Sequence, residues 1–111
     1  MKLKIDFSEP IFPKEEVLMI QPTDLNDFYA AASDLDKSNL YFVLQTSLYH
    51  YEEQGLKLLA AHVSFLAAYY LFVALTPPGS GLLALHYINR ALELNPLPEY
   101  EEWLKLIKKG N

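Results

Sequence analysis

A run of 18 residues from Leu58 to Leu75 contains no charged side chain, and this run limits the possible folds more than any other feature. A segment of this length and composition either crosses a membrane or forms the central helix of a small helical domain, covered by neighbours on every side. One histidine, one serine and two tyrosines interrupt the run, and amphipathic segments flank it. The sequence therefore favours a buried helix over residues 57–75, with a membrane-associated protein as the alternative.

The composition indicates one globular domain with few options for chemistry. The chain has 111 residues, of which 51% are hydrophobic, enough for one domain with a core. The absence of cysteine excludes disulfides, thiolate metal sites and cysteine nucleophiles. A net charge of -5 repels phosphate backbones, so we expect no nucleic-acid partner. No apolar stretch directly follows Lys2 and Lys4, so we expect a cytoplasmic protein without an export signal.

The spacing of hydrophobic residues predicts five helices. They cover residues 24–36, 39–54, 57–75, 82–95 and 98–109. Thr23 and Ser38 are the expected N-caps of the first two helices, and Leu35 is expected on the buried face of the first. Only Gly55 separates the second helix from the third, so these two should pack antiparallel.

Residues 1–22 differ from the rest of the chain. Leu3, Ile5 and Phe7 alternate with polar residues, which suits a short strand, and three prolines exclude a long helix. The stretch 17–20 either pairs as a strand with residues 2–7 or belongs to a helical turn that begins after Pro13. We therefore expect an all-α fold of about five helices over residues 23–111, with residues 1–22 as a short extended N-terminal arm.

The segment 84–96 resembles the second helix of a tetratricopeptide repeat (TPR). That family has the pattern Ala-x3-Phe-x2-Ala-x4-Pro, in which small residues admit a partner helix and proline ends the unit. The matching positions here are Ala84, Ile88, Ala91 and Pro96. The preceding helix resembles the family's Trp-x2-Leu-Gly-x2-Tyr at Val63, Leu66, Ala67 and Tyr70.

The resemblance can be placed in two ways. Tyr70 and Ala84 are separated by more residues than the family has between these positions. A second frame matches the family's Tyr, Gly, Ala and Ala to Tyr51, Gly55, Ala60 and Ala67. Both frames use the helix at 57–75, and the sequence leaves the choice open.

The resemblance implies a TPR-like stack of antiparallel helical hairpins that binds another protein or a peptide. In such a stack, the helix at 98–109 would cap the last repeat. Members of this family are usually scaffolds or co-chaperones, so we expect an adaptor with no catalytic residue and no cofactor. The high apolar content predicts in addition that a fixed partner, or a second copy in a homodimer, covers part of the surface.

The best candidates for binding a partner lie on the second helix. Tyrosine combines apolar area with a polar tip, which suits a binding surface. The candidate residues are Tyr41, Gln45, Tyr49, His50, Glu52 and Glu53. Alternatively, these tyrosines cover the N-terminal arm or shield the edge of the core.

Histidine supplies the main alternative to an interaction module. His50, His62 and His86 stand on three separate predicted helices, and none forms the i, i+4 pair of a helical metal site. We therefore expect no metal site. The alternative is a small enzyme or ligand-binding domain that uses His62 or His86 in a pocket near Tyr69 and Tyr70.

Overall fold

The computed structural model describes residues 2–110 of the chain, and this part is all-α. Of the described residues, 72% are helical, and no strand occurs between residues 2 and 110. The five α-helices are α1 (Pro22–Ala31), α2 (Asp34–Glu53), α3 (Lys57–Tyr69), α4 (Ser80–Leu94) and α5 (Pro98–Lys109). A short 3-10 helix, η1 (Val17–Met19), precedes them, and a π-helix, η2 (Tyr70–Leu75), continues α3. The prediction of an all-α fold is confirmed. Residue 1 of the predicted arm (1–22) and residue 111 of the predicted helical domain (23–111) lie outside the described residues.

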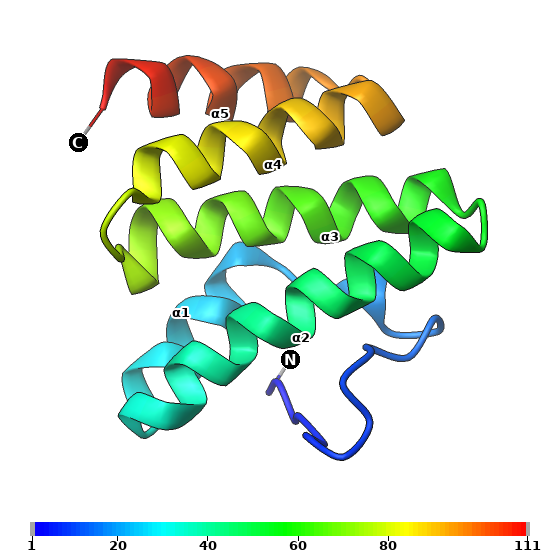
Figure 1. Ribbon diagram of the computed structural model, residues 1–111, viewed down its shortest axis with the longest axis vertical. Coiled ribbons are helices and arrows are strands. Elements are labelled where there is room, and N and C mark those ends of the chain that lie inside the picture. The colour runs from blue at the N-terminus through cyan, green and yellow to red at the C-terminus, as the bar shows by residue number, and fades with distance from the viewer. Residues whose placement is uncertain (1, 111) are drawn as a thin grey trace.

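The helices from α2 to α5 lie side by side in the order of the chain (Figure 1). In that view α3 runs through the middle, with α2 on one side and α4 on the other, and α5 lies beyond α4. Aromatic rings also join α3 to α5, since Phe65 stacks on Tyr100 at 5.1 Å and Tyr69 meets Trp103 edge-on at 5.2 Å. The central helix is therefore in contact with three neighbours.

This central position explains why the run from Leu58 to Leu75 contains no charged side chain, since a helix covered by its neighbours has little surface in contact with water. The helical stretch Lys57–Leu75 is the one part of the described chain that is long and apolar enough to cross a membrane. However, 72% of its most apolar window is buried inside the fold. The run begins as an α-helix and ends as η2, where Thr76 adopts a left-handed conformation with φ 43°.

The boundary between the first two helices differs from the prediction. The helical conformation is interrupted at Ala32 and Ser33, between α1 and α2. The Ser33 hydroxyl accepts a hydrogen bond from the Asp36 amide at 3.2 Å. Ser38 is therefore inside α2, and Leu35 is 70% exposed. Acids are favourable at the start of a helix and unfavourable at its end, which explains why Asp34 and Asp36 open α2.

The start of α1 also lies earlier than the prediction. Gln21 is the N-cap in place of Thr23, and Pro22 occupies the first turn. Gln21 and Asp24 form a reciprocal capping box, in which each side chain accepts a hydrogen bond from the backbone of the other. Proline suits the first helical position because no partner is available there for an amide hydrogen.

The N-terminal arm lies on the helical body, and its described residues, from 2 onward, form no strand. A helical turn follows Pro13, so the helical alternative for this stretch is correct and the strand pairing is wrong. Four of its apolar side chains are buried: Leu3, Phe12, Val17 and Ile20. The backbone of Phe12 is held by α2, because its amide donates to the Ser47 hydroxyl at 3.0 Å and its carbonyl accepts from the Tyr51 hydroxyl.

Most of the TPR-like pattern occupies the core. Seven of its eight positions are fully buried: Val63, Leu66, Ala67, Tyr70, Ala84, Ile88 and Ala91. Pro96 is exposed in the connection between α4 and α5. The turn between α2 and α3 contains Gly55 at φ 73°, a left-handed conformation that costs glycine little.

Candidate interaction face

Side chains of α2 and α4 meet across the central helix and form one surface. On α2, Tyr41, Gln45 and Tyr49 follow each other at intervals of four residues, and Glu52 comes three residues later, so all four share one side of the helix. On α4, Tyr87 and Arg90 point toward them. We name these six residues the α2–α4 face.

Small residues on α3 allow this approach. Ala60, Ala61, Ala67 and Ala68 are buried, and the Ser64 hydroxyl donates to the Tyr87 carbonyl at 2.6 Å. A large side chain at position 64 would prevent such a close approach between α3 and the backbone of α4. The apolar central helix therefore positions Tyr87 beside α2.

Three tyrosine hydroxyls converge on one amide within the face. The Tyr41 and Tyr87 oxygens are 2.8 Å apart, and their rings meet edge-on at 6.2 Å. The Gln45 nitrogen lies 3.1 Å from the Tyr87 hydroxyl, 3.3 Å from Tyr49 and 3.4 Å from Tyr41. Burial raises the pKa of the Tyr87 hydroxyl, and the hydrogen bond with Tyr41 raises it further. The hydroxyl therefore stays protonated at neutral pH.

An ion pair continues the face toward the end of α2. The Arg90 Nε donates to Glu52 at 2.7 Å, and its Nη1 donates to Glu93 at 2.9 Å. The Arg90 side chain is 36% exposed and that of Glu52 is 26% exposed, so the pair is partly accessible to solvent. Such a pair orients side chains more than it stabilises the fold, since exposed pairs contribute about 0.2–1 kcal/mol.

The outer side of the face is apolar and open. Phe42 is 55% exposed and Tyr49 is 56% exposed, and the Phe42 ring lies 5.3 Å from that of Tyr41. The N-terminal arm is hydrogen-bonded to α2 through Thr46, Ser47 and Tyr51. Tyr41 is partly buried against the core, as the alternative of a shielded core edge predicts. The face thus combines exposed aromatic area with oriented polar groups.

The structure separates the six sequence candidates into two groups. Tyr41, Gln45, Tyr49 and Glu52 lie in the face. The His50 ring lies edge-on to that of Tyr51 at 5.4 Å. Glu53 is exposed and forms no hydrogen bond or ion pair through its side chain within the described residues. Sequence reasoning missed Tyr87, although its position three residues after Ala84 and one before Ile88 places it on the buried stripe of α4.

The histidines do not assemble into a site. The His62 Nε2 donates to the Ile20 carbonyl at 2.8 Å, whereas His86 is exposed beside Tyr87 at a ring distance of 5.1 Å. Burial lowers the pKa of His62, and the bond to Ile20 and the charge of Glu99 oppose this shift. Within residues 2–110, no group of three or more metal-ligating side chains is close enough to hold an ion.

Tyr69 and Tyr70, where the alternative function expects a pocket, are buried and hydrogen-bonded. The Tyr70 hydroxyl donates to the Lys37 carbonyl, and the Asn26 amide donates to the Tyr69 hydroxyl at 2.7 Å. Both rings are buried. The ring contact of His62 within the described residues is with Phe65, at 6.3 Å.

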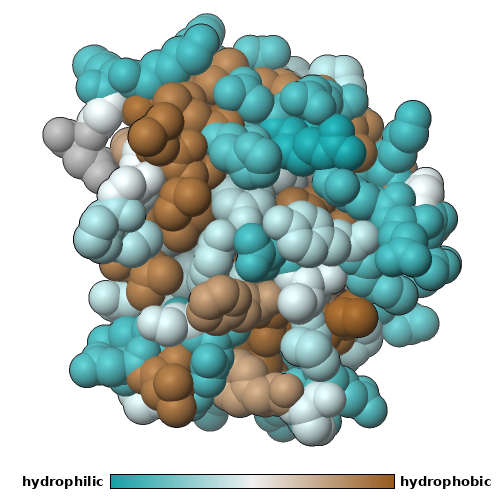
Figure 2. All heavy atoms as spheres, viewed as in Figure 1, coloured by the Kyte–Doolittle hydropathy of each residue, from teal (hydrophilic) through white to brown (hydrophobic). Residues whose placement is uncertain are grey.

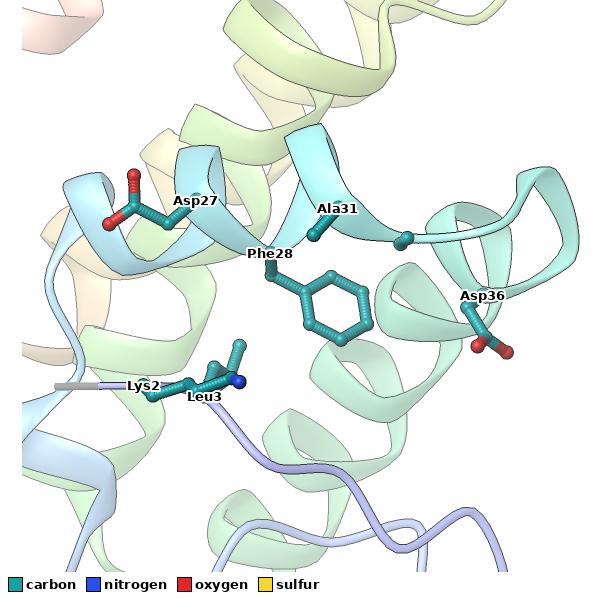
Figure 3. A pocket seen from close by; sticks show the side chains of 7 residues that line it. Lys2, Leu3, Asp27, Phe28, Ala31 and Asp36 are labelled. Carbon is teal, nitrogen blue, oxygen red and sulfur yellow. The ribbon is translucent and has the colours of Figure 1, made fainter.

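A hollow of about 670 Å³ lies elsewhere, between the N-terminal arm, α1 and the start of α2. Its lining residues are Lys2, Leu3, Asp27, Phe28, Ala31, Ala32 and Asp36. Figure 3 shows the Phe28 ring extending from α1 into the space between Leu3 and Asp36. The lining of this hollow contains no histidine and no hydroxyl side chain, and it shares no residue with the α2–α4 face.

No family model, curated protein or solved structure matches this chain. The description of the face therefore depends on its own geometry, and the TPR resemblance depends on the spacings in the sequence.

Proposed function

We propose that this protein is a non-catalytic adaptor of the TPR-like type, which binds another protein or a peptide in the cytoplasm through the α2–α4 face. The observation that supports this proposal is the cluster in which Gln45 lies within 3.4 Å of three tyrosine hydroxyls while Tyr49 stays 56% exposed. Tyrosine and arginine are enriched in protein interfaces, and groups held in place lose little entropy on binding.

The alternation of helix contacts supports the TPR-like arrangement. Side chains of α2 touch α4, and side chains of α3 touch α5, as expected when consecutive helical hairpins stack. Under the frame that begins at Tyr51, α2 and α4 are the first helices of successive repeats. In proteins of this family, the first helices can carry the residues that bind a ligand, so this frame assigns binding to the α2–α4 face.

Site-specific crosslinking tests the proposed function. The photoreactive amino acid p-benzoylphenylalanine replaces Tyr49 in the full chain, and a matched protein carries it at the exposed Phe7 of the arm. We expect one recurrent crosslinked polypeptide from position 49 in the source cells, and its loss when Gln45→Lys and Arg90→Glu are added. Equal crosslinking from positions 7 and 49, or crosslinking that survives both substitutions, would refute the proposal.

A further inference from the structure

A second surface, distinct from the α2–α4 face, lies at the turn between α2 and α3. It is a shallow groove of about 540 Å³. Its lining residues are Lys14, Leu18, Gly55, Leu56, Lys57, Leu58 and Leu59. Leu18 and Leu58 remain 51% and 60% exposed, so two large apolar side chains are open to solvent here. We name this surface the lysine groove.

The lining of the lysine groove carries two positive charges and no negative one, on a protein whose net charge is -5. Lys14 and Lys57 are the charged residues of its lining, and neither forms an ion pair within the part of the chain that the structure describes. A suitable occupant has an apolar side chain with a carboxylate on each side.

The chain itself presents such a group at the start of α2. Leu35 is 70% exposed and stands between Asp34 and Asp36. Among the exposed large apolar residues of the described chain, it is the one with an acid on both sides. The Asp34 side chain extends fully into solvent, although Lys37 lies 3.6 Å from it. We name residues 34–36 the acidic knob.

We propose that the acidic knob of one copy binds in the lysine groove of a second copy. Leu35 would pack between Leu18 and Leu58, and the two aspartates would face Lys14 and Lys57. The knob and the groove lie at opposite ends of α2, about 30 Å apart for a helix of 20 residues, so they cannot meet within one molecule. This contact joins two different surfaces, and repeated copies therefore form an open chain or a ring.

Other exposed surfaces do not identify their occupant in this way. Figure 2 shows apolar side chains gathered where α4 begins and α5 ends, a region that includes the exposed Leu82, Leu83 and Leu106. Nothing in its chemistry distinguishes one apolar partner from another. The lysine groove and the acidic knob match in charge as well as in apolar character, so the second copy is the occupant that the chain itself offers.

Analytical ultracentrifugation of the full chain tests the proposal. At low salt, we expect the weight-average mass to rise with concentration beyond that of a dimer, and 1 M NaCl to reverse this because it screens the charges. Leu35→Lys should weaken association by about tenfold or more, because it removes the buried apolar contact. Lys57→Glu should weaken it by up to about fivefold, because it removes an exposed ion pair. Lys57→Glu adds an acid to the first turn of α3, which favours the helix, so unfolding would not explain its effect. The matched control Leu82→Lys, at another exposed leucine, should associate like the natural protein.

Mixing the two variants identifies the kind of contact. The Leu35→Lys protein keeps an intact lysine groove, and the Lys57→Glu protein keeps an intact acidic knob. An equimolar mixture should therefore form heterodimers and no larger species, because each protein has one intact surface. The proposal is overturned if the natural protein stays monomeric at all concentrations, or if neither variant weakens association. It is also overturned if the weight-average mass of the mixture is no larger than that of each variant alone. None of these results depends on the partner of the α2–α4 face.

Discussion

Removing the Tyr87 hydroxyl is the most direct perturbation of the α2–α4 face. Tyr87 is 3% exposed, and its oxygen pairs with the Tyr41 hydroxyl at 2.8 Å and lies 3.1 Å from the Gln45 amide. Each neutral hydrogen bond contributes about 0.5–1.5 kcal/mol net, and water can reach the half-buried Tyr41 and Gln45 once the hydroxyl is gone. We therefore expect Tyr87→Phe to lower the free energy of unfolding by about 1 kcal/mol.

Urea unfolding followed by circular dichroism measures this change, provided that the slope against urea stays constant. In a double-mutant cycle with Tyr41→Phe, the two substitutions should be coupled by about 0.5–1 kcal/mol. Tyr49→Phe is the matched control, because its hydroxyl also contacts Gln45 but belongs to a side chain that is 56% exposed; its effect should stay within about 0.5 kcal/mol. Additive effects of Tyr41→Phe and Tyr87→Phe, or a Tyr87→Phe protein as stable as the natural one, would show that the hydroxyls do not form a joint network.

Three further predictions concern the helix ends and His62. Ser33→Ala removes the N-cap bond to Asp36 and should cost about 1 kcal/mol of unfolding free energy in urea, whereas an unchanged midpoint would contradict that cap. Gly55→Ala forces a side chain into a φ of 73° and should cost about 1 kcal/mol in the same assay, and a stabilised variant would contradict the strain. Burial lowers the pKa of His62 below 6.5, so the unfolded chain binds the proton more readily and stability should fall as the pH drops through 6.5. His62→Gln retains a donor for the Ile20 carbonyl and should flatten that part of the pH profile, and an unchanged profile would assign it to another group.

The five α-helices could be predicted because hydrophobic spacing is a local property of the sequence. The break between the first two helices was placed wrongly because Ser33 and Ser38 are both acceptable N-caps. Asp36, three residues after Ser33, is the signal that separates them, since an acid is favourable near the start of a helix. The change from α3 to η2 has no such signal. It depends on the Thr76 amide, which donates to the Leu71 carbonyl, and the apolar pattern is the same in both forms of helix.

For a related reason, the residues of the α2–α4 face on α2 could be predicted from the sequence, and those on α4 could not. Tyr41, Gln45 and Tyr49 share one side of α2 by spacing alone. The contacts of Tyr41 and Gln45 with Tyr87, and of Glu52 with Arg90, join residues about 40 positions apart. No local pattern specifies which helices become neighbours. The lysine groove depends on tertiary packing in the same way, because it brings residues of the arm to the turn between α2 and α3.

The composition of the central helix accounts for both the stability and the surface of this fold. An apolar helix with small residues can be covered on several sides at once, and α3 accordingly touches α2, α4 and α5. The same small residues allow the backbone of α4 to approach to 2.6 Å from the Ser64 hydroxyl. Tyr87 then stands close enough to α2 to meet Tyr41 and Gln45. The run of residues that at first suggests a membrane span is therefore the physical reason that side chains of α2 and α4 form one continuous face.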